Sequence, residues 1–233
     1  MGNSKTINFF GFELVEDEAK LLKEFYKNND FLTKRRNKNL EKTIQSLFKR
    51  KRIITKDGHV VEIEMPGETI ESFPKEISYF KNLREVNLAA NKFSNIPKEF
   101  YKLENLTYIT VRNYCIGEVQ GISGLKNLEV LDLYSCAIYS FPKEVTKLEN
   151  LKRLNLGSNW GKYIIPAEIS KMKSLEELEL YETKLKSISR NILKLENLKK
   201  LDIRHDNMDY KIIPIVDKLE EKGVEVYHRF DKF

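Results

Sequence analysis

The sequence lacks any apolar stretch long enough to cross a bilayer, and it lacks the apolar run near its first residue that a secretory signal requires. Cysteine is also scarce, because the chain of 233 residues has only Cys115 and Cys136. A disulfide between them is conceivable, but a protein without a secretory signal meets a reducing compartment. We therefore expect free thiols and a cytoplasmic protein.

Histidine is equally scarce, which argues against catalysis and metal binding. The chain has three histidines at distant positions, His59, His205 and His228. The one constellation worth naming is His205 with aspartates at positions 202, 206 and 209, and its spacing matches no metal-ligand template. The segment GSNWGKY at 157–163 has one residue too few between its glycines for a phosphate-binding loop, and a tyrosine where serine or threonine is required. We expect no enzyme activity, no cofactor and no metal.

The net charge of +6 is confined to the first quarter of the chain. Residues 1–58 carry 14 Lys and Arg against 8 Asp and Glu, so residues 59–233 are balanced, with 27 of each sign. Two basic clusters contain Lys34, Arg35, Arg36, Lys38, Lys49 and Arg50. No nucleic-acid-binding motif accompanies them, which leaves a solvated basic face or contact with an anionic membrane surface. The first six residues, MGNSKT, match an N-myristoylation pattern, which would supply a second membrane anchor.

Apolar residues recur with a single spacing through most of the chain. In one unit Leu83, Val86 and Leu88 stand at offsets 0, 3 and 5, and Asn91 stands at offset 8. The same spacing begins, with steps of 22 to 24 residues, at Val60, Leu83, Leu106, Leu128, Leu151, Leu175 and Leu198. Such a period is typical of a solenoid, because one unit buries its apolar face only by stacking on its neighbours.

The pattern L-x-x-L-x-L-x-x-N-x-L resembles the leucine-rich repeat family over residues 60–223, and units such as LEVLDLYSCAIYSFPKEVTKLEN at 128–150 match it throughout. Ile-Pro or Phe-Pro pairs at 73–74, 96–97, 141–142 and 165–166 are similar to the Ras-group intracellular type. The resemblance implies an α/β leucine-rich repeat solenoid, with a curved parallel β-sheet on the concave face and short helices or 3-10 turns on the convex face. It also makes a small GTPase one candidate partner.

Three parts are expected along the chain. Residues 1–58 form a basic N-terminal cap with helices over 16–28 and 39–51, followed by a β-hairpin of strands 53–56 and 59–63 around an Asp-Gly turn. Residues 59–213 hold about seven leucine-rich repeats. Residues 214–233 form a C-terminal αβ cap, in which a helix over 215–222 precedes a last strand over 224–227 that closes the sheet.

Within each unit, offsets 0, 3, 5, 10, 13, 17 and 20 should point inward. In one unit this predicts a core of Leu131, Leu133, Ile138, Phe141, Val145 and Leu148. In the family, offset 8 holds a polar side chain that pairs with backbone groups, and Tyr114 departs from this rule. Two units, at 159–165 and 206–213, are longer before their proline. We expect these loops to bulge from one rim and to present, as packing or as a binding edge, Trp160, Tyr163, Met208 and Tyr210.

Offsets 2, 4, 6 and 7 should project from the concave face, because strand residues alternate sides. Several residues at these offsets are tyrosine or arginine, which are enriched at the energetic centres of protein interfaces. Across the strands, the distance from Arg112 to Arg204 should be about 19 Å. The predicted partner-binding residues are Tyr108, Arg112, Val130, Asp132, Tyr134, Arg153, Asn155, Glu179, Tyr181 and Arg204. We expect a monomeric, non-catalytic module that binds a protein partner, and not nucleic acid, through this face. The alternative is a peripheral membrane adaptor that docks through its basic N-terminal cap.

Overall fold

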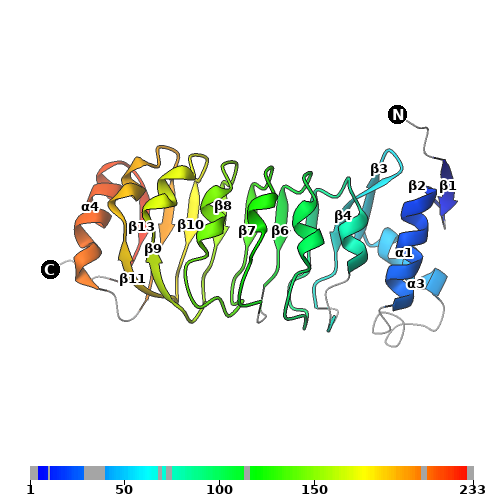
Figure 1. Ribbon diagram of the computed structural model, residues 1–233, viewed down its shortest axis with the longest axis horizontal. Helices are drawn as coiled ribbons and strands as arrows, with labels where there is room; N and C mark the ends of the chain where they lie inside the picture. The colour runs from blue at the N-terminus through cyan, green and yellow to red at the C-terminus, as the bar shows by residue number, and fades with distance from the viewer. Residues whose placement is uncertain are drawn as a thin grey trace.

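The computed structural model describes residues 5–9, 11–28, 40–67, 70–71, 75–112, 116–205 and 209–229, and it shows an elongated stack of strands (Figure 1). The central strands are β3 Ile53–Lys56, β4 His59–Glu64, β5 Glu85–Asn87, β6 Tyr108–Thr110, β7 Val130–Asp132, β8 Arg153–Asn155, β10 Glu177–Glu179, β12 Lys200–Asp202 and β13 Glu225–Tyr227. They form one sheet in the order β13-β12-β10-β8-β7-β6-β5-β4-β3. Neighbouring strands are parallel except β3 and β4, which are antiparallel.

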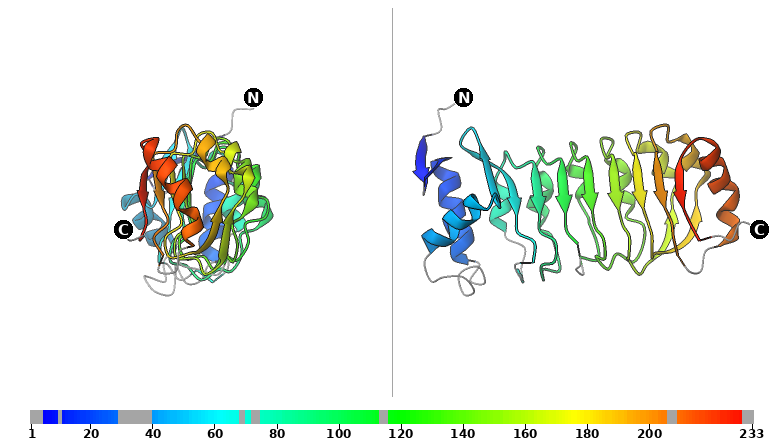
Figure 2. Two further views of the ribbon diagram at one scale, coloured as in Figure 1. Left: turned by 90° about the vertical axis from the view of Figure 1, so that its left-hand side faces the viewer. Right: turned by 180° about the vertical axis from the view of Figure 1, so that it is seen from behind.

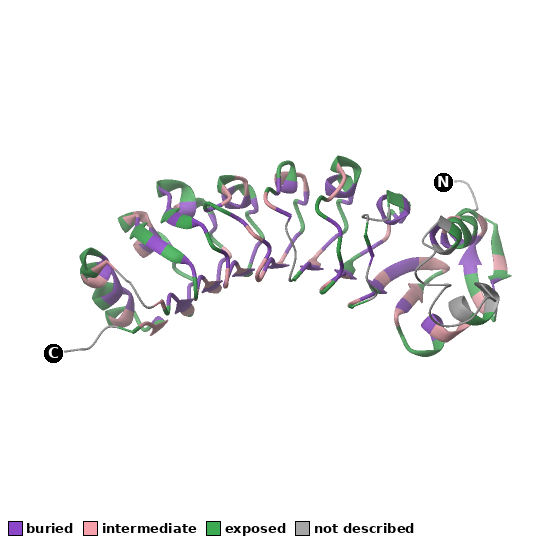
Figure 3. Ribbon diagram, turned by 90° about the horizontal axis from the view of Figure 1, so that it is seen from below, coloured by how far each residue is buried: buried purple, intermediate pink, exposed green. Residues whose placement is uncertain are grey.

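The return segments of the repeats carry 3-10 helices on the side opposite the sheet. These are η1 Lys75–Tyr79, η2 Lys98–Lys102, η3 Ile122–Gly124, η4 Lys143–Lys147, η5 Ala167–Lys171, η6 Arg190–Lys194 and η7 Tyr210–Ile212. Figure 3 shows that the stack is an arc with the strands on its inner side and these helices on its outer side. The predicted α/β solenoid with a concave parallel sheet is therefore confirmed.

The core runs through the whole stack, because each repeat contributes side chains at the same offsets. The predicted core of one unit is confirmed, since Leu131, Leu133, Ile138, Phe141, Val145 and Leu148 are all buried. At offset 8, Asn159 is also buried, and its side chain makes four bonds of 2.9 Å to backbone groups: Nδ2 donates to the carbonyl oxygens of Leu133 and Leu156, and Oδ1 accepts from the nitrogens of Cys136 and Ile138. A longer bond of 3.4 Å joins Nδ2 to the carbonyl oxygen of Gly157. Such bonds satisfy polar groups in a turn that has no strand partner. Tyr114 lies outside the described residues.

The first elements cover the β4 end of the stack. They comprise β1 Thr6–Phe9, β2 Phe12–Val15, α1 Glu16–Asn28 and α3 Leu40–Lys49. The buried carboxylate of Glu18 in α1 accepts the backbone N–H of Val60 at 2.6 Å and lies 2.9 Å from Nδ1 of His59, which joins α1 to β4. The bounds of α1 and the Asp57-Gly58 hairpin agree with prediction. Helix α3 ends at Lys49, before the predicted end at Lys51, whose φ is 53°, and Asn39 lies outside the described residues. The β1–β2 hairpin was not predicted.

The C-terminal elements cover the other end. Helix α4, Ile213–Glu221, begins before the predicted position, because Pro214 suits the first turn of a helix. Gly223 follows with a φ of 84°, and β13 then pairs with β12 in parallel. The last strand is therefore confirmed as part of the sheet.

The prediction of a bulging loop at 159–165 is wrong. Residues Lys162–Ile165 form strand β9, which pairs with β11, Lys184–Ile188, in a separate two-stranded sheet. Because strand residues alternate sides, Tyr163 points into the core, where it is fully buried and its hydroxyl donates to the carbonyl oxygen of Ile138 at 3.2 Å. Trp160 and Tyr210 are exposed, and Met208 lies outside the described residues.

Two expectations from the sequence concern cysteine and the membrane. Cys136 is a buried free thiol, and its Sγ donates to the carbonyl oxygen of Val111 at 2.6 Å. Cys115 and Gly2 lie outside the described residues. Among the helices that the structure describes, none combines the length and the apolar character needed to cross a bilayer.

Candidate partner-binding face

Arginine and tyrosine side chains follow one another along the concave side of the nine-stranded sheet, whose strands the right-hand view of Figure 2 shows from behind. The row, called here the Arg-Tyr row, contains Arg112, Tyr134, Tyr181, Arg204 and Tyr227. The rings of Tyr134 and Tyr181 stack with centroids 5.7 Å apart. The Cζ atom of Arg112 is 6.0 Å from the Tyr134 ring centroid, and that of Arg204 is 6.0 Å from Tyr181 and 5.4 Å from Tyr227. These are cation–π distances, so the five side chains form one continuous surface.

Gly157 makes the tyrosine stack possible. Tyr134 follows β7 and Tyr181 follows β10, so β8 lies between them, and Gly157 occupies the same offset after β8. A Cβ atom at Gly157 would lie 2.7 Å from Cε1 and 2.8 Å from Cζ of Tyr181. The missing side chain therefore leaves the space in which the Tyr181 ring crosses the intervening strand.

Two buried aspartates hold the arginines of the row in place. Nε of Arg112 donates to Oδ2 of Asp132 at 2.5 Å, and Oδ1 of Asp132 accepts the backbone N–H of Tyr134 at 3.1 Å. Nε and Nη2 of Arg204 donate to the two carboxylate oxygens of Asp202 at 3.0 and 2.6 Å. Asp132 was predicted as part of the contact surface, but only 6% of it is exposed. Its role is to orient Arg112.

The charge states follow from these contacts. The hydrogen bond to Asp132 raises the pKa of the Arg112 guanidinium, and the hydrogen bond to Asp202 raises that of Arg204. Burial, with Tyr134 as the second cause, raises the pKa of the Tyr181 phenol. At neutral pH both arginines are therefore charged and the Tyr181 phenol is neutral.

A depression of about 130 Å³ lies beside the row, between β6 and β10. Six of the predicted residues line it together: Arg112, Val130, Asp132, Arg153, Asn155 and Glu179. Nε of Arg153 is 3.1 Å from Oε2 of Glu177, and Nζ of Lys200 is 2.9 Å from Oε1 of Glu179. Tyr108, in β6, is half-buried. The structure thus collects the ten predicted residues on one face, at strands β6 to β12 or just after them.

The β4–β5 end of the same face is acidic. Glu62 and Glu64 lie in β4 and Glu85 in β5, and Glu62 pairs directly with Glu85 across the two strands. Burial, followed by the charges of Glu85 and Glu64, raises the pKa of Glu62. The concave face therefore differs along its length, because carboxylates gather at the β4–β5 end without basic partners among the residues that the structure describes, whereas Glu177 and Glu179 of β10 pair with Arg153 and Lys200.

The basic clusters are described only in part. Lys34, Arg35, Arg36 and Lys38 lie outside the described residues, whereas Lys49 and Arg50 are exposed at the end of α3. Asp206, beside His205, also lies outside them. Within the part of the chain that the structure describes, no group of three or more histidine, cysteine or acidic residues could hold a metal ion.

Three contributors to the site were missing from the predicted contact set: Gly157, Asp202 and Tyr227. The sequence signal for Gly157 was a glycine at offset 6 between two tyrosines at the same offset, which favours a contact across it. Asp202 stands at offset 4, as Asp132 does. Tyr227 lies in the predicted last strand, but only the parallel pairing of β13 with β12 brings it to Arg204.

The chain is similar to known repeat proteins. A family described as "Leucine-rich repeat region" matches residues 108–221. No curated protein is similar to this sequence. A leucine-rich repeat protein of Leptospira interrogans is 33% identical, with a TM-score of 0.58 over 70% of this chain, which spans only 42% of that protein's length.

Two further solved structures share the fold. Internalin C2 of Listeria monocytogenes is 16% identical with a TM-score of 0.59, over 89% of this chain and 92% of that one. The leucine-rich repeat domain of the type III effector XopL is 17% identical with a TM-score of 0.60, over 90% and 88% of the two chains.

Proposed function

Because the chain belongs to the leucine-rich repeat proteins, whose repeats are typically non-catalytic interaction domains, we propose that it binds a protein partner through the concave face, with the Arg-Tyr row at the centre of the contact. The observation that carries this proposal is the unbroken sequence of stacking and cation–π contacts from Arg112 to Tyr227. In this reading the chain has no catalytic role.

The row has the properties of an energetic centre. Tyrosine and arginine dominate binding energy when they are packed and shielded from water, and the row spans about 19 Å from Arg112 to Arg204. That width suits one side of an ordinary protein interface. Asp132 and Asp202 already fix the two guanidinium groups, so little side-chain entropy is lost when a partner covers them.

The polarity of the face restricts the partner. The acidic end at Glu62, Glu64 and Glu85 favours a basic patch on the partner, whereas the Arg-Tyr row favours aromatic, apolar or acidic groups. A partner with both features separated along its surface would bind in one direction along the arc. A small GTPase remains the candidate class that the repeat subtype predicts, and a cytoplasmic monomer remains the expected setting.

The test is capture of partners from a lysate of the source cells, followed by affinity measurement with the purified partner. Wild type is compared with a triple variant, Arg112→Ala, Tyr134→Ala and Tyr181→Ala. The matched control removes two exposed side chains of β11 on the flank, Lys184→Ala and Lys186→Ala. We expect the triple variant to lose a partner that wild type and control retain, with affinity at least about 100-fold weaker.

Thermal unfolding separates binding from folding in this experiment. Tyr134 and Tyr181 are half-buried and Arg112 pairs with the buried Asp132, so the triple variant should lose some stability. It should remain cooperatively folded, because the apolar core of the repeats is unchanged. If wild type and triple variant capture the same proteins with the same affinity, or if everything captured is released by moderate salt from both, the concave face is not the binding surface.

A further inference from the structure

The small sheet on the flank of the solenoid has an open edge. It contains only β9 and β11, and Figure 1 shows the two strands side by side near α4. The carbonyl oxygens of Gly161 and Ile165 accept hydrogen bonds from the backbone nitrogens of Lys184 and Ser189, at 3.2 and 3.1 Å. Backbone polar groups of a strand alternate between its two edges, so the N–H and C=O groups of Lys162 and Ile164 point away from β11. Among the described residues, no strand pairs with that edge.

A groove of about 440 Å³ lies along this open edge. Three consecutive repeats line it, through residues 117–120, 140–144 and the β9 residues Lys162 and Ile164. Its apolar lining comes from Val119, Phe141 and Pro142, together with the Ile164 side chain. The groove therefore combines unpaired strand groups with an apolar surface, which are the two requirements for binding an extended peptide.

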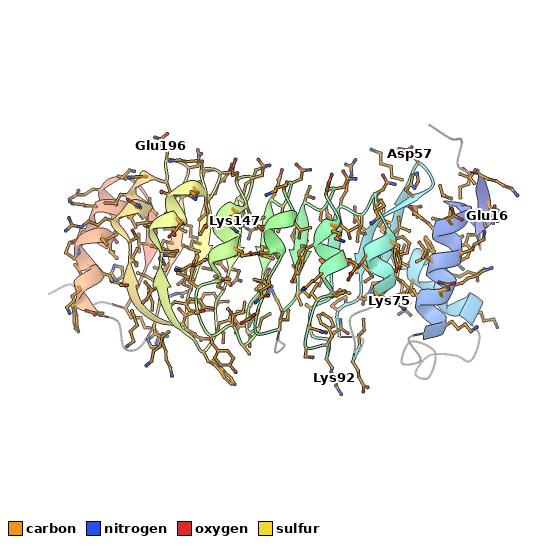
Figure 4. The ribbon with its side chains drawn as sticks, viewed as in Figure 1. Glu16, Asp57, Lys75, Lys92, Lys147 and Glu196 are labelled. Carbon is orange, nitrogen blue, oxygen red and sulfur yellow. The ribbon has the colours of Figure 1, made fainter. Side chains whose placement is uncertain are left out.

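The balance of unpaired charge in the groove is positive. Oε2 of Glu144 accepts the backbone N–H of Gly121 at 2.8 Å, and its Oε1 lies 3.7 Å from Nζ of Lys147, which Figure 4 labels on η4. Oε2 of Glu118 accepts from the Gln120 side chain at 2.6 Å, but that amide is neutral and leaves the charge of Glu118 in place. Lys143 and Lys162 have no ion pair among the described residues, so the groove holds two unpaired ammonium groups against one unpaired carboxylate.

Large apolar side chains are exposed in the segments that form the groove. Ile164, which lines the groove, is 59% exposed, and Tyr139 and Trp160, which stand next to lining segments in the sequence, are 66% and 71% exposed. They come from adjacent repeats, and Gly161 brings two of these repeats together, because a Cβ atom at that position would lie 2.0 Å from the carbonyl oxygen of Tyr139. Exposed apolar side chains next to an unpaired strand edge mark an interaction site.

We propose that this groove binds an extended peptide segment of another protein, in which an acidic residue stands next to a large apolar one. The peptide adds as a third strand to β9, pairing with the N–H and C=O groups of Lys162 and Ile164. Its apolar side chain lies against Phe141 and Val119, and its carboxylate lies between Lys143 and Lys162. This site is separate from the concave face and does not depend on the function proposed for that face.

A second copy of the chain is the less suitable occupant. Pairing of two β9 edges would bring Lys143 and Lys162 of one copy towards the same lysines of the other, and like charges at close range oppose such pairing. An acidic peptide meets the same lysines with favourable charge, and its backbone supplies the donors and acceptors that the edge needs.

The probes are octapeptides in which a central Phe or Leu is flanked by Asp, Lys or Ser, presented as an array to the full chain. Two variants change the groove. Ile164→Pro removes the N–H that faces the groove and keeps the hydrogen bonds that the carbonyl oxygens of Gly161 and Ile165 accept from Lys184 and Ser189. The pair Lys143→Glu and Lys162→Glu reverses the charge of the two unpaired lysines. The matched charge control, Lys184→Glu with Lys186→Glu, alters β11 on the far side of β9.

We expect Asp-flanked peptides to bind wild type and the β11 control most tightly, and each groove variant to bind them about tenfold more weakly. Saturating peptide should slow amide exchange at Ile164. If Ile164→Pro does not fold, the charge reversal alone decides. The proposal is overturned if no peptide binds, if Lys-flanked peptides bind best, if both groove variants bind as wild type does, or if the triple variant of the Arg-Tyr row loses the peptides instead.

Discussion

Replacing Gly157 by alanine changes the Arg-Tyr row without removing any of its functional groups. The new Cβ would lie 2.7 to 3.0 Å from three ring atoms of Tyr181, which is closer than carbon atoms approach in folded proteins. The φ angle of Gly157 is not in the left-handed region, so alanine fits the backbone there. The Tyr181 ring is the far end of a half-buried side chain, so the ring moves and the strand stays. The stack on Tyr134 is lost.

The magnitude follows from two opposing effects. A stacked aromatic pair contributes about 0.5 to 1.5 kcal/mol beyond its buried area. Replacing glycine by alanine at a compatible position stabilises by about 0.4 to 1 kcal/mol, because the unfolded chain loses freedom. In wild type, Gly157→Ala should therefore lower the free energy of unfolding by no more than about 1 kcal/mol. In a Tyr181→Ala background, where no ring is met, the same change should be stabilising.

Urea denaturation of wild type, the two single variants and the double variant measures this difference. The coupling between Gly157→Ala and Tyr181→Ala should be about 0.5 to 1.5 kcal/mol, equal to the stacking that the alanine disrupts. If Gly157→Ala lowers the free energy of unfolding equally in both backgrounds, the alanine does not act through the Tyr181 ring. The assigned role of Gly157 would then be wrong. The affinity for the captured partner should fall in the Gly157→Ala variant as well.

Three further predictions concern folding. Asn159→Ala removes the four short bonds to buried backbone groups and should lower the free energy of unfolding by at least about 3 kcal/mol in urea denaturation. The control Asn150→Ala removes one exposed bond and should lower it by no more than about 1 kcal/mol. Equal losses in the two variants would contradict the role assigned to Asn159. Gly161→Ala would place a Cβ 2.0 Å from the carbonyl oxygen of Tyr139, and a backbone oxygen cannot move aside as a ring can. Thermal unfolding should therefore show that the free energy of unfolding falls by more than about 2 kcal/mol, which is more than for Gly157→Ala. Burial raises the pKa of Tyr101 and of Tyr163 above the usual value for tyrosine. Above about pH 10 the folded state therefore binds more protons than the unfolded state, and the free energy of unfolding should fall as pH rises. The expected slope is about 1.4 kcal/mol per pH unit for each tyrosine, and no loss is expected below that pH. The pair Tyr101→Phe and Tyr163→Phe should flatten this alkaline slope, and an unchanged slope would show that other groups cause it.

The repeat spacing predicted most of the architecture, since offset alone decides which side chains face inward in a solenoid. Leu131 and Leu133 are buried because every unit places an apolar residue at the same offsets, so neighbouring units agree. The hairpin at Asp57-Gly58 was predictable for a local reason, because both residues adopt the positive φ angles that its turn requires.

Local pattern failed where a segment found its partner in another repeat. Residues 162–165 looked like a loop insertion, but they form a strand because residues 184–188 of the next unit lie beside them. The buried position of Tyr163 follows from that pairing. The β1–β2 hairpin was missed for another reason: its two strands are neighbours in the sequence, but each has only four residues, and its apolar residues are buried in the core of the whole stack or packed against it.

The sequence by itself determined the solenoid, the concave position of the ten predicted residues and the scarcity of groups for catalysis, because all three depend on residue type and period. Only the tertiary structure decided which of those side chains act together. Asp132 holds the Arg112 side chain, and Tyr181 reaches Tyr134 across Gly157, because distances between strands set these contacts. The open edge of β9 likewise depends on which backbone segments pair across repeats, and no single unit contains that information.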